Sequence, residues 1–340
     1  MRRRGRSDGN VRVTLGQVAA LAAVSTATVS RALNEPKAVS DALRNRVGAA
    51  VIRLGYLPNQ TARTLSSQHS RLAGILVEAF DPGCAEVLDA IQKRLAATGY
   101  TTLIAATGGD SDRADNAARE MAAREVEGLV LVGIDPGDSL ETLLEARHIP
   151  CVLVDAGGTQ TQATVGGGYT AGGAIVGAYL LGLGHRSVAF VGGATNTRWR
   201  RATMLLGLRA ALSTSGPGLP SQRVLDCALP EIRARLRQWI AAPAPPTALV
   251  CADDLLALAV LQECALLGIA VPGQLSVVGC GDFPFARHTS PTLSTLRIPG
   301  AMIGAVAVDQ LLGRLAGAAP TARSIPVKLV IRHSSGPAPL

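Results

Sequence analysis

The chain has 340 residues and a formal net charge of +8, which is unevenly distributed. Up to residue 71 there are 12 Lys or Arg against 3 Asp or Glu, whereas the remaining residues have 21 against 22. A cation-rich segment joined to a near-neutral body favours a polyanionic partner, because phosphates give basic surfaces a salt-dependent affinity. A solvated basic face without a partner is the alternative. The length predicts two or three domains with buried cores.

Several classes of protein are excluded by what the sequence lacks. No uninterrupted apolar run is long enough to span a membrane, and Gln17 interrupts the stretch behind Arg2–Arg4 that otherwise resembles a secretory signal. The six cysteines lie far apart without a CxxC pair, which predicts reduced core residues rather than a metal centre. We therefore expect a cytoplasmic protein without a metal or a cofactor.

Catalytic motifs are missing from the sequence as well. The chain contains no P-loop, no GxSxG and no HExxH, and its glycine runs at 166–168 and 172–173 do not form GxGxxG. The five histidines are scattered. We therefore do not expect an enzyme.

Residues 13–34 predict two short helices joined by a tight turn. Thr14 can cap the first helix and Gln17 can reach back to it, which is the reciprocal pattern of a capping box. Ser25 offers a second cap after a break at residues 22–24.

The second of these helices has an outer face suited to DNA. Val29 and Leu33 form its inner face, and a third helix capped by Ser40 follows. Short hydroxyl, methyl and guanidinium groups contact base edges or phosphates when a helix enters a major groove. The outer residues of this kind are Thr26, Ala27, Thr28, Ser30 and Arg31. An ordinary three-helix subdomain is the alternative.

The segment after the third helix predicts a linker. Gly55 can end the third helix, and Asn59 can cap a short helix that runs into a polar stretch. Taken by itself, this segment is typical of a frayed linker.

Three consecutive segments carry a resemblance to a known family. ATVSRALN, VSDALRNRV and LGYLPNQTARTLSS follow one another, beginning at Ala27, Val39 and Leu54. Together they resemble the DNA-binding headpiece of lactose-repressor-type bacterial transcription regulators. One departure is Ala23, which stands at a turn position often held by Gly in this family. A Cβ there costs about 1 kcal/mol or more if the backbone is left-handed.

The resemblance implies roles for individual headpiece residues. Thr26, Ala27 and Arg31 are expected to contact bases, and Ser30 lies on the same face. The residues expected to hold phosphates are Thr14, Ser25, Thr28 and Asn34.

The resemblance also implies that the linker is a hinge helix that orders on operator DNA. Leu65, beside the small residue Ala62, matches the leucine that wedges into a central minor groove, in the helix that Asn59 caps. Such a wedge bends the duplex at a cost of roughly a few kcal/mol, which further contacts offset.

From Leu72 onward, short apolar segments alternate with longer helix-like segments. Continuously apolar strands with helical crossovers predict a doubly wound α/β architecture with parallel sheets covered on both faces. The predicted strands are LAGILVEAF, TTLIAAT, EGLVLVG, PCVLVDA, HRSVAFVGG, PTALVCADD and LSVVGCGD.

The resemblance implies that this part is a periplasmic-binding-protein-like core of two lobes, between which the chain crosses three times. We place the crossings near Asp155–Thr159, Pro291–Thr295 and Ala318–Thr321. The expected organisation is a helix-turn-helix headpiece at 1–57, a hinge at 58–70 and a core at 71–340. Within the core, lobe one is about 71–156 and 295–318, and lobe two is about 157–291 and 321–333.

Polar residues that follow predicted strands are candidates for a ligand site, because ligands of open α/β sheets bind beyond the carboxyl ends of the strands. Arg200 and Arg201 near the start of another helix add guanidinium groups, whereas Asp254 is expected to cap a helix. The mixture suits a polyhydroxylated, acidic small molecule; a set of loop caps and salt bridges is the alternative. The other candidates are Glu78, Phe80, Asp81, Asp155, Tyr169, Asp253 and Asp282.

Departures from the general family pattern favour one branch. Many members carry an Arg three residues before Gly207, where this chain has Met204. The usual VGxDN is VGGGY at Val165–Tyr169, and the usual GFDD is GCGD at Gly279–Asp282. Both changes remove groups expected to hold a neutral sugar. Together with NEPKAVSDALR, which begins at Asn34, and ADDLLALAVLQECALLGIAVPG, which begins at Ala252, these departures resemble the gluconate-repressor branch.

The sequence therefore predicts a DNA-binding transcription repressor that forms a homodimer or a higher oligomer. Its expected partners are double-stranded operator DNA and a small sugar or sugar-acid effector, gluconate or a similar acid, whose binding releases the DNA. The alternative is a solute-binding protein of the same two-lobed fold that does not regulate DNA.

Overall fold

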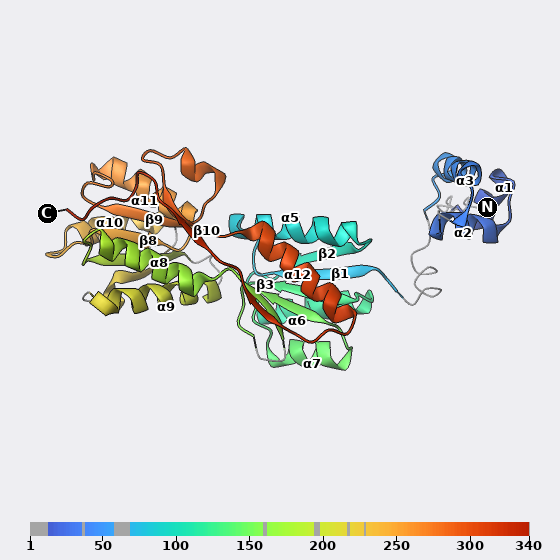
Figure 1. Ribbon diagram of the computed structural model, residues 1–340, viewed down its shortest axis with the longest axis horizontal. Coiled ribbons are helices and arrows are strands. Elements are labelled where there is room, and N and C mark those ends of the chain that lie inside the picture. Colours follow the sequence, from blue (N-terminus) through green and yellow to red (C-terminus); the bar gives the residue numbers. More distant parts are fainter. Residues whose placement is uncertain are drawn as a thin grey trace, which may run out of the picture. The chain divides into compact units, whose positions relative to one another are not determined.

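A computed structural model describes residues 13–35, 38–57, 69–158, 162–193, 198–215, 218–227 and 229–339. The chain forms two compact units, Met1–Ser70 and Arg71–Leu340, which we call the headpiece and the core (Figure 1). No helix within the described ranges is both long enough and apolar enough to cross a membrane.

The described residues of the headpiece form three α-helices whose starts the sequence predicts. They are α1 (Leu15–Leu21), α2 (Thr26–Asn34) and α3 (Asp41–Leu54). Thr14 and Gln17 form the expected capping box, and the side chains of Ser25 and Ser40 cap α2 and α3. Each cap satisfies a backbone N–H that the first helical turn leaves without a partner.

The headpiece helices pack around a small aliphatic core. Val18, Val29 and Val47 are 0%, 0% and 1% exposed, so each helix contributes one fully buried valine. Ala23, in the turn between α1 and α2, has φ +50°. The backbone at this position is therefore left-handed, the conformation in which a Cβ costs about 1–2 kcal/mol.

The core contains two six-stranded sheets. The first has the strand order β11-β5-β4-β3-β1-β2 and the second β12-β10-β9-β8-β6-β7. Every recorded pairing is parallel except β10 with β12. The strands are β1 (Leu72–Val77), β2 (Thr101–Ala106), β3 (Gly128–Val132), β4 (Cys151–Val154), β5 (Ala163–Gly166), β6 (Val188–Gly193), β7 (Val224–Cys227), β8 (Ala248–Cys251), β9 (Ser276–Gly281), β10 (Ser294–Arg297), β11 (Ala322–Ser324) and β12 (Lys328–Val330).

Helices cover both faces of each sheet, as Figure 1 shows for the core. The first sheet lies between α5 with α12 and α6 with α7, and the second between α8 with α9 and α10 with α11. The helices are α5 (Pro82–Ala97), α6 (Ser111–Ala123), α7 (Asp138–Ala146), α8 (Tyr169–Gly182), α9 (Arg198–Ser215), α10 (Ile232–Ile240), α11 (Asp254–Leu267) and α12 (Gly300–Leu315). This arrangement is the predicted doubly wound, two-lobed α/β core.

The three crossings between lobes lie later in the chain than the sequence suggested. β5 and β11 belong to the first sheet and β10 to the second, so the chain crosses after Gly166, Arg297 and Ser324. The crossings placed near Asp155–Thr159, Pro291–Thr295 and Ala318–Thr321 were therefore wrong, as were the lobe limits built on them. β11 is a short edge strand that is exposed throughout, and β5, between β11 and β4, is a four-residue strand with alternating burial. Neither therefore has the apolar run that identified the predicted strands.

Two glycines allow α8 and α9 to approach each other closely. A Cβ on Gly173 would overlap the backbone of Met204, and one on Gly207 would overlap the backbone of Thr170. This contact fixes α9 against α8 and so places the first turn of α9, with Arg200, beside the first crossing.

Candidate functional site

The outer face of α2 carries the residues predicted to contact DNA. Thr26, Ala27 and Arg31 are exposed, whereas Val29 and Ala32 face the headpiece core. The helical spacing of α2 therefore places the predicted DNA-contacting residues on its exposed face and the apolar residues in the headpiece core, as expected.

The residues expected at phosphates lie around the same helix. Thr14, Ser25 and Asn34 are exposed, and Thr28 and Ser30 are half-buried. The hydroxyls of Ser25 and Thr28 lie 2.8 Å apart, and Asn34 Nδ2 donates to Ser30 Oγ at 3.2 Å. The three hinge candidates, Asn59, Ala62 and Leu65, lie outside the described residues.

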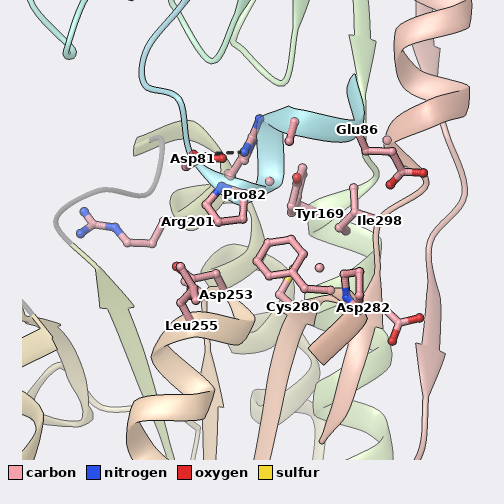
Figure 2. Close-up of a pocket in the computed structure, with 18 residues that line it drawn as sticks. Asp81, Pro82, Glu86, Tyr169, Arg201, Asp253, Leu255, Cys280, Asp282 and Ile298 are labelled. Atoms are coloured by element: carbon pink, nitrogen blue, oxygen red, sulfur yellow. Dashed lines mark ion pairs between the residues drawn. The ribbon is translucent and has the colours of Figure 1, made fainter. Parts of the chain in front are cut away.

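The core has a cavity of about 320 Å³ lined from both lobes, shown in Figure 2. Lobe one contributes the start of α5, and lobe two contributes the starts of α8, α9 and α11 with the loop after β9. The lining residues are Asp81, Pro82, Gly83, Ala85, Glu86, Tyr169, Arg200, Arg201, Ala252, Asp253, Leu255, Cys280, Gly281, Asp282, Phe283, Pro284, Ile298 and Gly300. We call this cavity the interlobe pocket.

Arg200 connects the two lobes at the wall of the interlobe pocket. Its Nε donates to Asp155 Oδ2 at 3.2 Å, and its Nη1 lies 3.8 Å from Asp81 Oδ2. Asp155 has φ +49° and also accepts from the backbone N–H of Gly167 at 2.8 Å and from the hydroxyl of Tyr169 at 3.4 Å. The buried carboxylate of Asp155 thus organises the first crossing and orients the guanidinium.

The described residues leave hydrogen-bond donors of the Arg200 guanidinium available to a ligand. The bond from Nε to Asp155 is the one hydrogen bond recorded for this side chain within the described residues. The Nη1 approach to Asp81 is longer than a hydrogen bond, and the Asp81 carboxylate already accepts from the backbone N–H of Cys84 at 2.7 Å. A guanidinium oriented in this way presents donors suited to a carboxylate.

Burial keeps the neighbouring phenol neutral. The pKa of Tyr169 is raised well above its usual value, mainly because the ring is buried, with Asp155 adding to the effect. Tyr169 also packs edge-on against Trp199, with ring centroids 6.3 Å apart. The phenol therefore acts as a hydrogen-bond donor beside Arg200.

The other predicted charged residues of the pocket already have partners. Arg201 Nη1 lies 2.5 Å from Asp226 Oδ1, and Figure 2 shows Arg201 extending away from the other labelled side chains. Asp253 accepts from the backbone N–H of Leu256 at 2.7 Å and so caps α11. Arg201 and Asp253 therefore contribute to the wall of the pocket from fixed positions.

Asp282 is held from behind the pocket. Its carboxylate lies 3.0 Å from Arg297 Nε and 2.6 Å from Arg332 Nη2, and its side chain is 2% exposed. It also has φ +55°, a left-handed backbone that is uncommon for a residue with a Cβ. The paired guanidiniums fix this carboxylate, so it is poorly placed to turn towards a ligand.

Two of the predicted ligand residues lie elsewhere. Glu78 lines a separate cavity of about 240 Å³, which Thr107 and Asp135 also line. Phe80 is 64% exposed and does not line the interlobe pocket. Both follow β1, but the chain turns at Asp81 to begin α5, and only the residues from Asp81 onward reach the interlobe pocket.

The prediction that Asp254 caps α11 was wrong, because Asp253 is the cap. Asp254 is fully buried and accepts from the hydroxyl of Thr295 at 2.5 Å and from the backbone N–H of Phe283 at 2.8 Å. Burial raises the pKa of Asp254 to about 6, and the nearby Asp282 and Asp253 add to the rise. The residue thus ties the loop after β9 to α11 and β10.

The apolar residues that line the interlobe pocket were not predicted from the sequence. The residues concerned adjoin predicted ones, since Pro82 follows Asp81 and Phe283 follows Asp282. The prediction considered only polar residues at strand ends. The apolar residues next to those polar residues were the signal that could have indicated this wall. The missed apolar residues are Pro82, Ala85, Leu255, Phe283, Pro284 and Ile298.

Comparison with known proteins agrees with both units. Residues 14–59 match the bacterial regulatory proteins of the lacI family, and residues 178–335 match a periplasmic binding protein-like domain. The repressor PurR of Klebsiella pneumoniae (strain 342) is 30% identical over 335 residues, covering 96% of this chain and 98% of the relative. The chain belongs to the lacI family of bacterial regulatory proteins.

Solved structures of lacI-family regulators share the fold. A lac repressor dimer bound to operator and the anti-inducer ONPF has a TM-score of 0.83 and 25% identity, covering 96% of this chain and 99% of that one. The regulator GntR from Chromobacterium violaceum has a TM-score of 0.72 and 26% identity, covering 78% and 99%. As a member of this family the chain is a DNA-binding transcription regulator, and the relatives named are transcription regulators rather than enzymes.

Proposed function

We propose that this chain is a cytoplasmic repressor that binds operator DNA as a homodimer and releases it when a small carboxylic acid occupies the interlobe pocket. The similarity to a lac repressor dimer bound to operator, which extends over 96% of this chain, supports the DNA-binding part. Residues 1–57 of the headpiece would contact DNA and residues 58–70 would form the hinge.

The outer face of α2 supports the assignment of contacts on DNA. Thr26 and Arg31 are exposed on the side opposite the buried Val29, and the whole segment is strongly basic. We assign Thr26, Ala27 and Arg31 to bases, and the hydroxyl and amide groups around them to phosphates.

The observation that carries the effector assignment is the orientation of Arg200. Its Nε is fixed by Asp155 at 3.2 Å, the residue lines the pocket, and within the described residues its Nη atoms have no recorded hydrogen bond. A sugar acid such as gluconate, the choice that the gluconate-repressor resemblance favours, supplies a carboxylate for that edge. Arg201, held by Asp226, is given the lesser role of lining the pocket.

Thermodynamic linkage connects effector binding in the pocket with DNA binding. Arg200 belongs to lobe two, and Asp81 and Asp155 extend from lobe one, so a carboxylate on Arg200 changes the contacts that hold the lobes together. A ligand with different affinities for two lobe arrangements shifts the equilibrium between them. If the arrangement favoured by the acid is incompatible with operator binding, the acid lowers DNA affinity and acts as an inducer.

Calorimetry with the full-length protein tests the effector assignment. Gluconate is expected to bind more tightly than glucose, and Arg200→Ala is expected to weaken gluconate binding by at least about tenfold, because it removes charge-assisted hydrogen bonds. Arg209→Ala, on the exposed side of α9, is the matched control. Tighter binding of glucose than of any acid, or unchanged binding by Arg200→Ala, would rule out the carboxylate assignment.

A further inference from the structure

The described lining of the interlobe pocket has few groups that recognise hydroxyls. Among these residues no Ser, Thr, Asn, Gln or His occurs, and the neutral polar side chains are Tyr169 and Cys280. The Tyr169 hydroxyl already donates to Asp155. Polyhydroxylated ligands need a convergent set of donors and acceptors, because a buried hydroxyl without a partner is costly.

The carboxylates of the lining do not supply that set. Asp81 and Asp253 each accept the backbone N–H at the start of a helix, and Asp282 is shared by Arg297 and Arg332. Figure 2 shows the carboxylate of Glu86 directed away from Tyr169, Asp253 and Leu255. Each of these acids thus either has a structural task or faces away.

Apolar surfaces line the pocket from both lobes. Pro82 and Ala85 at the start of α5 belong to lobe one, whereas Leu255 at the start of α11 and Phe283 after β9 belong to lobe two. Leu255 is 37% exposed, as expected for a leucine that faces open space. A pocket with apolar walls on two sides suits a flat or ring-shaped body.

Gly281 makes the aromatic part of this wall possible. A Cβ at this position would come within 2.7 Å of the Phe283 ring, and φ of +130° disfavours any side chain there. Asp254 fixes the same loop by accepting the backbone N–H of Phe283. The Phe283 ring therefore occupies space that a side chain on residue 281 would otherwise fill.

We infer that the effector is a carboxylic acid with an apolar ring, aromatic or alicyclic, rather than a fully hydroxylated sugar acid. This inference rests on the proposed function, because it keeps the carboxylate on Arg200 and specifies the rest of the ligand. The ring packs between Pro82 and Ala85 on one side and Leu255 and Phe283 on the other. A cavity of about 320 Å³ is at the lower end of the range for small-molecule sites, roughly 300–1,000 Å³, and so suits a single ring.

The test compares four probes on the full-length protein by calorimetry: benzoate, cyclohexanecarboxylate, gluconate and benzyl alcohol. Benzoate or cyclohexanecarboxylate is expected to bind about tenfold or more tightly than gluconate, because the walls reward apolar contact. Benzyl alcohol is expected to bind more weakly than benzoate, because it lacks the charge that Arg200 holds.

Two variants test whether the ring of the effector packs against Phe283. Phe283→Ala is expected to weaken the ring acids by about tenfold and to leave gluconate unchanged, whereas Phe80→Ala, an exposed phenylalanine outside the pocket, leaves all four probes unchanged. The ranking of probes on the unmodified protein does not depend on how well Phe283→Ala folds.

Two outcomes separate this inference from the proposed function. If gluconate binds as tightly as the ring acids, or if neither ring acid binds, the apolar-ring inference is overturned. The carboxylate assignment is then decided separately, by whether gluconate binds and whether Arg200→Ala weakens its binding. If benzyl alcohol binds as tightly as benzoate and Arg200→Ala changes neither, the carboxylate assignment is overturned while the apolar pocket remains.

Discussion

At the scale of single residues, Arg31 is the exposed side chain of α2 best suited to read a base. It is the one guanidinium on that helix, and guanidinium groups bind guanine edges through two hydrogen bonds. Arg31→Ala is expected to weaken operator binding by roughly 1–3 kcal/mol and to change base preference. Thr28→Ala is expected to weaken operator and random DNA alike. Fluorescence anisotropy on both kinds of DNA measures the difference; equal losses on both for the two variants would contradict this division of roles.

Asp254 predicts a pH dependence of stability. Its pKa is about 6 in the folded protein against an ordinary value of 3.8, mainly because of burial, so the folded state binds this proton more readily than the unfolded state. The stability that this group contributes is therefore fully present below about pH 4 and is lost as the pH rises through about 6.

Asp254→Asn removes that titration and keeps an acceptor for the N–H of Phe283. The unfolding free energy of the unmodified protein is expected to fall relative to that of the variant between pH 4 and pH 6. Chemical denaturation of both proteins across this pH range measures the difference between their unfolding free energies. The contributions of the other carboxylates are the same in both proteins and so cancel in this difference. A difference that does not change with pH would show that Asp254 does not titrate there.

At the scale of elements, the contact between α8 and α9 depends on glycine. Gly207→Ala places a methyl group against the backbone of Thr170, so it is expected to lower the unfolding free energy by about 1–3 kcal/mol or more. Gly182→Ala, at the end of α8 where no other atom lies within 4 Å, is the matched control and is expected to be neutral or slightly stabilising. Denaturant unfolding measures both. A stable Gly207→Ala variant would mean that the helices can separate without cost.

Local signals made the headpiece helices and most core strands predictable from sequence. Thr14, Ser25 and Ser40 cap their helices through residues only three positions away, so the relevant contacts lie within one stretch of sequence. The strands of the sheet centres have continuous apolar runs because both faces are covered. β5 and β11 have no such run, and β11 joins the first sheet by pairing with β5, which lies far earlier in the chain.

The pocket was only partly predictable because many of its contacts join residues that are far apart in the sequence. The positions of Asp81, Asp155 and Asp253 beyond strand ends follow from the architecture. That Arg200 pairs with Asp155, 45 residues earlier, or that Asp282 is taken by Arg332, 50 residues later, follows from tertiary packing. The sequence thus indicated which residues approach the pocket, but not which of them remain available to a ligand.

At the scale of the whole molecule, charge and fold divide the chain in the same place. The headpiece, with 11 Lys or Arg against 3 Asp or Glu, carries the whole net charge of +8, and the core with the interlobe pocket has 22 of each sign. This division is what a regulator needs when one unit binds a polyanion and the other binds a small molecule. The crossings after Gly166, Arg297 and Ser324 give the core two lobes that can respond to a ligand between them.

The most direct test of the central claim is a binding titration over a range of salt concentrations, using a palindromic DNA selected from bound fragments and a random duplex of equal length. A sequence-specific repressor is expected to bind the palindrome as a dimer, at least about a thousandfold more tightly than the random duplex. The logarithm of its affinity should fall steeply with the logarithm of salt concentration, by about 0.9 for each phosphate contacted. Equal affinity for both duplexes at every salt concentration would rule out a sequence-specific repressor and favour a two-lobed solute-binding protein without a regulatory role.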